Sequence, residues 1–209
     1  MEVDRPGPGE ELNEGEASVP RPAATVILLR GGDSALEVLL VQRNPAQRFM
    51  GGAWVFPGGA VDPDDGGGQA GLRSAALRET AEEAGVALPS GSELVPYSRW
   101  ITPAAVKIRF DTWFFLAPLP AGAAPRVDGA ECVDLRWESP ASALEAYGRD
   151  ELLLVFPTIK HLEQLSGFVS AEALLAHARG REVAPVEPRV VLEGEVARVL
   201  LPGEPGYED

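Results

Sequence analysis

Three glutamates within five residues are the feature of this sequence that could most directly do chemistry. Glu79, Glu82 and Glu83 stand three and four positions apart. On an α-helix, side chains at these spacings fall within one sector of about 100°. Carboxylate oxygens are the ligands that hard divalent cations such as Mg²⁺ or Mn²⁺ prefer. A helix here would therefore carry a cation-binding patch, flanked by Arg78 as its counter-charge.

The segment around these acids has the pattern of a single helix after a loop. Residues 72–88 favour a helix closed by Gly85, whereas residues 61–71 lack apolar periodicity and predict a loop. Leu77, Thr80, Ala81 and Ala84 fall on the side opposite the glutamates, so we expect the helix to dock through them and to present its acids outward. A bare acidic cluster is more often a solvated helix face, so its surroundings have to decide.

Strands are expected on both sides of that helix. Residues 23–30 and 35–43 are β-like runs joined by a Gly-rich turn, which is typical of a hairpin. Residues 53–57 predict a short strand that stops at Pro57, with a reversal or loop after it. Further strands are predicted over 95–102, 108–117 and 131–137, helices over 141–147, 158–165 and 171–178, and β-like pieces over 190–195 and 197–201.

In this context the acidic helix and the FPGG before it resemble the Nudix box. That family signature is a glycine, five residues, a glutamate, seven residues, and then R-E-U-x-E-E-x-G-U, where U is apolar. The matching positions are Gly59 for the first glycine, Arg78 and Glu79 for R-E, Glu82 and Glu83 for E-E, Gly85 for the closing glycine and Val86 for the last apolar residue.

The sequence departs from the signature at three points. Asp65 stands where the first glutamate belongs, twelve residues instead of seven separate it from Arg78, and Thr80 replaces an apolar residue. We place the extra residues as an insertion in the loop before the helix, which leaves the spacing of the helical acids unchanged. The departure leaves open whether Asp65 can brace the loop.

The resemblance implies a Nudix-type α/β/α sandwich with a mixed β-sheet and a catalytic loop-helix. It also implies a metal-dependent diphosphatase, in which Mg²⁺ or Mn²⁺ held by Glu79, Glu82, Glu83 and the Gly59 carbonyl neutralises charge as water attacks a phosphorus atom. Arg78 would orient the carboxylates. The general base stays open between these glutamates and two later acids, Glu131 and Glu138.

Upstream, residues 39–59 resemble the extended signature of coenzyme A diphosphatases within the Nudix family. Arg43, Arg48 and Gly52 are in register with it, while Val41 and Asn44 replace its threonine and its serine or alanine. The resemblance implies that Arg43 and Arg48 bind substrate, and two guanidinium groups could clamp the extra phosphate of coenzyme A. The expected reaction cuts coenzyme A or acyl-CoA to 3′,5′-ADP and (acyl-)phosphopantetheine.

Two other functions stay open beside this one. The first is a Nudix diphosphatase for NADH, ADP-ribose or another nucleoside diphosphate derivative. The second is a Nudix module that binds a ligand without catalysis, against which the intact acidic triplet argues. A dinucleotide fold is disfavoured, because the G-x-G-x-x-G formed by Gly66, Gly68 and Gly71 follows no strand and no βαβ alternation continues.

Composition limits the partners. The formal net charge is -14 and the sequence has no basic stripe, so nucleic acid is not expected and a small-molecule nucleoside diphosphate substrate is. The sequence has no apolar run of the roughly 18 to 20 residues that a membrane span needs. A lone cysteine, Cys132, expected in the core, agrees with a reducing cytoplasm, and the N-terminal residues have no secretory pattern.

The 209 residues are enough for one domain with appendages. We expect a disordered acidic tail over residues 1–20, a Nudix domain over 21–185, and a C-terminal β extension and tail over 186–209. Exposed strands of the extension could exchange between two subunits, which would give a homodimer.

Overall fold

The computed structural model describes residues 2–3, 11–13, 15–33, 35–193 and 196–208. Its main sheet is built around β2 (Arg21–Arg30), in which residues 23–29 are all buried because helices cover both faces of the strand. β2 pairs with β3 (Glu37–Arg43) in the predicted hairpin, with Leu29 opposite Val38, and runs parallel to β7 (Phe110–Pro118).

The other strands of this sheet extend it on both sides. Its order is β4-β3-β2-β7-β6-β9, with β5 added to β2 and β8 added to β3. The added strands are β4 (Trp54–Val55), β5 (Gly58–Ala60), β6 (Val95–Ile101), β8 (Cys132–Glu138) and β9 (Pro185–Val186). The mixed sheet of the predicted fold class is therefore confirmed.

The chain reverses after β4, one of the two predicted outcomes, because β4 runs antiparallel to β3 and so in the direction of β2, whereas β5 runs antiparallel to β2. The strand itself was not predicted: residues 58–60 pair with residues 23–25 of β2. A Cβ atom at Gly58 would lie 2.5 Å from the Ala24 carbonyl oxygen and 2.6 Å from the Thr25 Cα, so only glycine fits there. The signal that favoured a loop, paired glycines, instead permits close strand packing.

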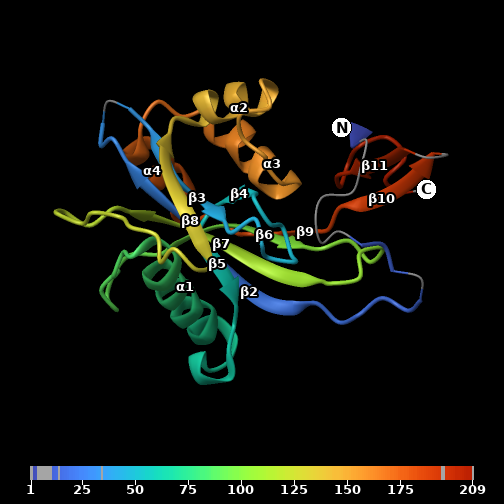
Figure 1. The fold of residues 1–209 in the computed structure, drawn as a ribbon, viewed down its shortest axis with the longest axis horizontal. Helices are drawn as coiled ribbons and strands as arrows, with labels where there is room; N and C mark the ends of the chain where they lie inside the picture. The colour runs from blue at the N-terminus through green and yellow to red at the C-terminus, as the bar shows by residue number, and fades with distance from the viewer. Residues whose placement is uncertain (1, 4–10, 14, 34, 194–195, 209) are drawn as a thin grey trace.

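Helices cover the two faces of the sheet unequally (Figure 1). α1 (Gly68–Ala84) lies on one face, where Leu72 and Ala76 join a cluster with Val26 and Phe115. The opposite face is covered by α2 (Pro140–Gly148), α3 (Phe156–Leu165) and α4 (Ala171–Ala178), which build the larger apolar cluster. Alternate residues of β2 enter the two clusters, as the period of two in a strand requires.

The insertion before α1 is more ordered than expected. Residues 63–65 form a short 3-10 helix, η1 (Pro63–Asp65), and α1 begins at Gly68, four residues before the predicted start. Part of the predicted loop is thus the first turn of the helix, and α1 ends as predicted, with Gly85 in the left-handed conformation at φ 63°.

The docking face of α1 also differs from the prediction. Thr80 and Ala84 are buried as expected, but Ala81 is exposed and Leu77 is only half-buried. Glu79 and Glu83 belong to the buried face, at 9% and 3% exposure, and do not point outward with Glu82. The helix packs against β5, where the absence of a side chain at Gly59 leaves room for Glu79.

The terminal segments add a second, smaller sheet. β1 (Glu2–Val3) pairs with β11 (Val196–Leu200), which forms a hairpin with β10 (Arg189–Glu193). Residues 11–13 lie along the β6–β7 loop, where the Lys107 amide donates to the Glu11 carbonyl at 2.8 Å. The division at residues 20 and 185 stays a prediction, and residues 1, 4–10 and 14 of the predicted tail lie outside the described residues. Among the described residues, no helix combines the length and apolar character that crossing a membrane requires.

Candidate active site

The site lies where the C-terminal half of α1 packs on β5. The Gly58 amide donates a hydrogen bond of 2.9 Å to the Glu83 carboxylate. At Gly59, a Cβ atom would lie 2.3 Å from a carboxylate oxygen of Glu79. The missing side chain at Gly59 therefore lets Glu79 reach the sheet, whereas Glu83 is held there by the Gly58 amide.

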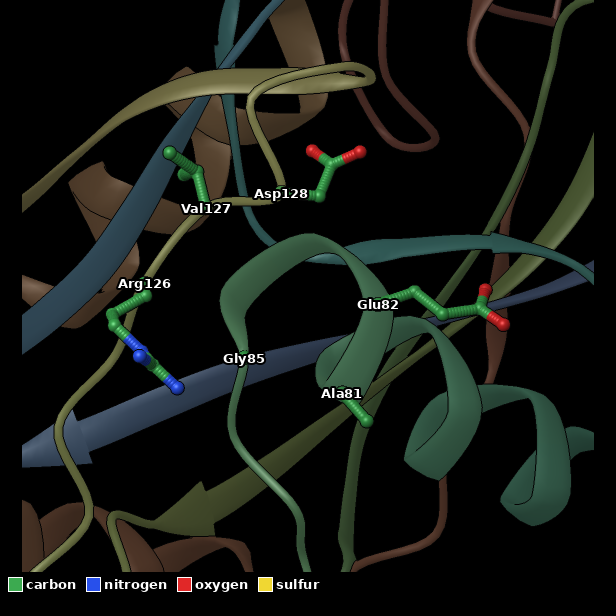
Figure 2. A pocket seen from close by; sticks show the side chains of 6 residues that line it. All are labelled: Ala81, Glu82, Gly85, Arg126, Val127 and Asp128. Carbon is green, nitrogen blue, oxygen red and sulfur yellow. The ribbon is translucent and has the colours of Figure 1, made fainter.

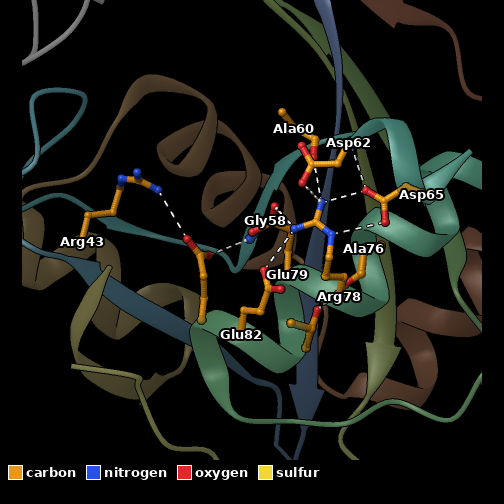
Figure 3. A network of polar contacts seen from close by, with 11 residues as sticks. Arg43, Gly58, Ala60, Asp62, Asp65, Ala76, Arg78, Glu79 and Glu82 are labelled. Carbon is orange, nitrogen blue, oxygen red and sulfur yellow. Dashed lines mark hydrogen bonds and ion pairs between the residues drawn. The ribbon is translucent and has the colours of Figure 1, made fainter. Parts of the chain in front are cut away.

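Arg78 joins the acids of the box (Figure 3). Its guanidinium donates to Glu79 at 2.8 Å and to Glu82 at 3.1 Å through Nη1. Through Nε and Nη2 it donates to Asp65 at 3.2 and 2.8 Å, and through Nη2 to the Ala60 carbonyl at 3.0 Å. These bonds raise the pKa of Arg78, the one to Asp65 most, so it is a fixed cation that holds α1, η1 and β5 together.

Asp65 closes the insertion onto the helix. It accepts from the Asp62 amide at 2.9 Å as part of the capping box of η1, and from Arg78 as above. The bond from Arg78 makes the largest contribution to lowering the pKa of Asp65, so this carboxylate stays charged. Although aspartate is one methylene shorter than the glutamate of the signature, η1 brings it within reach of the arginine, and it does brace the loop.

The three glutamates occupy two environments. Burial raises the pKa of Glu83 to about 7, against the Gly58 hydrogen bond and the charge of Arg43, and burial also raises the pKa of Glu79. Glu82 is exposed, with 60% of its side chain accessible. Among the described residues, no three acid, histidine or cysteine side chains stand together in a way that could hold a metal ion. Glu79 and Glu83 meet over β5, and Glu82 joins them only through Arg78.

The two arginines expected to bind substrate differ in environment. Arg43, at the end of β3, lies 3.5 Å from a Glu83 carboxylate oxygen and also donates to the Gln47 side chain. Arg48 is exposed in the loop between β3 and β4. No hydrogen bond or ion pair ties its guanidinium to the part of the chain that the structure describes. Arg43 is therefore part of the acidic cluster, and Arg48 is the cation free to meet a ligand.

Of the two later acids, one lies beside the site. Glu131 is exposed just before β8, and its charge contributes to raising the pKa values of both Glu79 and Glu83. Glu138 pairs with Val38 at the other end of β8, six residues after Cys132, which faces Arg43. At ~3.3 Å per strand residue, this places Glu138 about 20 Å away along the strand. The structure keeps Glu131 at the site and removes Glu138 from it.

A shallow pocket of about 290 Å³ opens beside the C-terminal end of α1 (Figure 2). Its floor is fixed where the Arg126 amide donates to the Ala84 carbonyl at 2.8 Å. The loop between β7 and β8 thus runs against α1. The pocket is lined by Ala81, Glu82, Gly85, Arg126, Val127 and Asp128.

Comparison with known proteins decides the family. Residues 19–157 match the family model of the NUDIX domain, well over half of the chain. The chain belongs to the Nudix family. The predicted family and its α/β fold are confirmed, and this family is one of hydrolases. Nudix hydrolases generally use divalent metal ions, and the family binds small-molecule nucleotide substrates.

Relatives and solved structures agree with this. The chain is 33% identical over 116 residues to human "Acyl-coenzyme A diphosphatase NUDT19", covering 53% of this chain and 31% of that protein. It is 27% identical over 180 residues to "Putative nudix hydrolase 7" of Caenorhabditis elegans, covering 70% and 60% of the two chains. The chain thus spans about a third and 60% of the lengths of these relatives.

Among solved structures, a Nudix hydrolase from Alicyclobacillus acidocaldarius has a TM-score of 0.67 and 29% identity, covering 76% of this chain and 96% of its own. The Nudix domain of Shewanella oneidensis NrtR, a structure complexed with ADP ribose, has a TM-score of 0.54 at 24% identity, with coverage of 70% and 86%. The second likeness shows the fold alone.

The sequence pattern of the Nudix box identifies Arg78 and the three glutamates, but two sets of residues that contact the site lie outside the box. Asn44 and Gln47 connect the loop of Arg48 to Glu131, and Asp128 shapes the turn before Glu131. Asn44 was noted only as a departure from the signature of coenzyme A diphosphatases. The signal that could have identified it is its type, because asparagine can bond to backbone groups that a serine or alanine side chain does not reach.

Proposed function

We propose that this Nudix chain hydrolyses the diphosphate of coenzyme A or acyl-CoA, releasing 3′,5′-ADP and (acyl-)phosphopantetheine. The observation that carries the proposal is the packing of Glu79 and Glu83 on the two glycines of β5, tied by Arg78 to Glu82. The register of Arg43 and Arg48 with the coenzyme A signature supports this substrate, as does the likeness to a human protein named as an acyl-CoA diphosphatase.

The donors are all oxygen atoms, which suit hard divalent cations, although the three glutamates do not stand together in the part of the chain that the structure describes. Two buried carboxylates with raised pKa values face only Arg78 and Arg43 as positive charges, so added positive charge would favour their ionised forms. We assign Glu79, Glu82, Glu83 and the Gly59 carbonyl as the groups that would hold Mg²⁺ or Mn²⁺. When bound, such ions supply polarisation of the phosphoryl oxygens and activation of water.

The side chains of this protein would do the rest of the work. Arg78 keeps Glu79 and Glu82 in place, and Asp65 keeps Arg78 in place. Glu131 accepts the proton of the attacking water as the new O–P bond forms. The bridging P–O bond breaks at the same phosphorus, and its electron pair leaves with the departing phosphate group. An exposed carboxylate without bonds to the acidic cluster is suited to this transfer.

A first experiment identifies the reaction. The protein is incubated with Mn²⁺ and, in separate reactions, coenzyme A, acetyl-CoA, NADH and ADP-ribose, and the products are separated by chromatography. We expect 3′,5′-ADP from the two coenzyme A substrates and a loss of about a thousandfold in Glu82→Gln. Glu172→Gln, an equally exposed acid on α4, is the matched control and keeps full activity.

The other outcomes separate the alternatives. Turnover of NADH or ADP-ribose with coenzyme A left intact would refute the substrate and leave a Nudix diphosphatase of another specificity. Equal, negligible rates in the wild type and in Glu82→Gln would favour a ligand-binding module without catalysis.

A second experiment tests the role of Arg48. If its free guanidinium meets the 3′-phosphate of coenzyme A, Arg48→Ala raises KM for coenzyme A by about 10- to 100-fold, as loss of a charge-assisted pair predicts. Dephospho-coenzyme A, which lacks that phosphate, should show less than a twofold change. Arg149→Ala removes another exposed arginine, which pairs with Glu151 after α2, and controls for net charge. Equal losses for both substrates would contradict the assignment.

A further inference from the structure

Two loops meet at the edge of the acidic cluster, and Asn44 makes the contact between them. One loop, residues 44–53, follows β3 and carries Arg48. The other, residues 119–131, follows β7 and ends at Glu131. The main-chain N–H of Asn44 donates to the Glu131 carbonyl at 2.8 Å, and the side-chain Nδ2 of Asn44 donates to the Ala130 carbonyl at 2.8 Å. Asn44 thus binds two successive backbone oxygens of the acid-bearing loop.

Asp128, in the same loop as Glu131, stabilises the turn that carries this acid. Its carboxylate accepts from the Glu131 amide at 2.9 Å and from the Cys132 amide at 2.9 Å. Gly129, at φ 78°, makes the tight turn that brings these groups together. The backbone of Glu131 is therefore fixed at its N–H by Asp128 and at its carbonyl by Asn44, while its carboxylate stays exposed.

On the side of the arginine, Gln47 continues the connection into the cluster. Its Nε2 donates to the Glu131 carbonyl at 3.4 Å, and its side-chain oxygen accepts from Arg43. Arg43 in turn pairs with Glu83 at 3.5 Å. A continuous series of polar contacts therefore runs from Glu131 through Gln47 and Arg43 to a buried carboxylate of the Nudix helix.

We propose that Asn44 is a positioning residue for the hydrolysis, which acts by locking the loop of Glu131 to the loop of Arg43 and Arg48. This inference rests on the proposed function. Asn44 stands where the coenzyme A signature has serine or alanine, and neither of those side chains provides an amide that reaches the Ala130 carbonyl. The competing role is local, because the Asn44 side-chain oxygen also accepts from the Ala46 amide at 2.9 Å and stabilises its own turn.

A double-mutant cycle separates the two roles. Asn44→Ala should lower kcat about tenfold, a usual effect for a residue that orients a reacting group, with KM changed less than twofold. In a Glu131→Gln background the same substitution should cost less than twofold, because Asn44 acts through Glu131. Asn13→Ala is the matched control, since its amide bonds only within residues 13–16 of the N-terminal segment. Multiplicative losses in the double variant would overturn the proposal.

Hydrogen exchange supplies a measurement that does not depend on turnover. Asn44→Ala should speed exchange in a peptide covering residues 129–133 about tenfold, while Asn44→Asp, which keeps the acceptor for Ala46 but loses the donor, should do the same. Unchanged exchange in both variants would refute the coupling of the loops. If the wild type hydrolyses no diphosphate, the proposed function fails, and this exchange result alone decides whether Asn44 holds the turn of Glu131.

Discussion

Each face of the sheet buries an ionisable group, and burial shifts the pKa values of these two groups in opposite directions. On the face covered by α1, burial raises the pKa of Glu83 to about 7, and that carboxyl touches Gly58 and Arg43. On the face covered by α3, burial lowers the pKa of His161 to about 4. His161 is fully buried among aromatic rings, with Phe114 at 4.2 Å between ring centroids.

Both groups have hydrogen-bond partners, but the partners of His161 lie closer than those of Glu83. The Pro157 carbonyl can only accept, so the His161 Nδ1 donates to it at 2.6 Å, and Nε2 accepts from the Ser98 hydroxyl at 2.6 Å. A neutral ring uses both nitrogens, and nothing remains to react. The Glu83 carboxylate accepts from the Gly58 amide at 2.9 Å and from the Arg43 guanidinium at 3.5 Å, the latter a long contact. A buried neutral ring with two short hydrogen bonds builds structure, whereas a buried carboxylate with one short hydrogen bond and one long ion pair is suited to bind a cation.

The largest expected effect breaks the acidic face. Glu83→Gln should reduce kcat about a thousandfold, because it removes a charge at the reacting centre. The same variant should be more stable than the wild type by about 2 kcal/mol at pH 8, since the buried charge is gone. The native pKa lies above the unfolded value, so this difference is largest above pH 7 and disappears below about pH 4.5.

Urea unfolding of Glu83→Gln at pH 8 and pH 4.5 measures this. Glu145→Gln, an exposed acid of α2, is the control and should show no such pH-dependent difference. A Glu83→Gln variant less stable than the wild type at pH 8 would contradict the account of a carboxylate whose burial outweighs its bonds to Gly58 and Arg43.

A smaller effect comes from filling the space that the glycine leaves. A Cβ atom at Gly59 would stand 2.3 Å from Glu79, so Gly59→Ala has to displace that carboxylate. We expect a loss of about a hundredfold in kcat/KM, with a small change in Tm because the displaced atoms end a flexible side chain. Gly67→Ala adds the same methyl group in open space and should leave activity unchanged. Activity near the wild-type level in Gly59→Ala would show that Glu79 need not touch β5.

The smallest effect concerns the other face. Because the native pKa of His161 lies below its unfolded value, the unfolded chain binds the extra proton, and stability is lost as pH falls from about 6.5 toward 4. This histidine should cost about 2 kcal/mol of unfolding free energy between pH 7 and pH 5. His161→Phe should remove that slope and leave kcat at pH 7.5 within twofold of the wild type.

His177, the other histidine of the sequence, is exposed on α4 and gives the matched control. His177→Ala should keep the pH slope of the wild type. An unaltered slope in His161→Phe would mean that other groups set the acid sensitivity of this face.

The sequence predicts the order of the elements well, because each has a strong local pattern. The β2–β3 hairpin, α1 with its Gly85 cap, and the three later helices all form where apolar periodicity placed them. The strand at β5 could not be foreseen, since its two glycines carry no β signal and its pairing depends on β2 packing closely over them.

For the site, the residues were more predictable than their burial. The Nudix box identified Arg78 and the three glutamates, but a helical wheel assigns every acid to solvent and so missed the inward turn of Glu79 and Glu83. Asn44 contacts the loop of Glu131 from more than 80 positions away, and only the fold brings these two loops together. Asp128 lies three residues before Glu131, in a turn that has no recognisable sequence motif.

The short helix η1 and the first turn of α1 absorb the extra residues of the box. The ion pair of 2.8 Å between Asp65 and Arg78 joins η1 to the middle of α1 and so closes this segment on itself. Residues 66–68 are three exposed glycines, and a Cβ atom added at any of them would meet nothing within 4 Å. We therefore expect residues 66–68 to tolerate an insertion. An epitope or a fluorescent label placed there would report on the enzyme in a mixture without changing the spacing of the acids of α1.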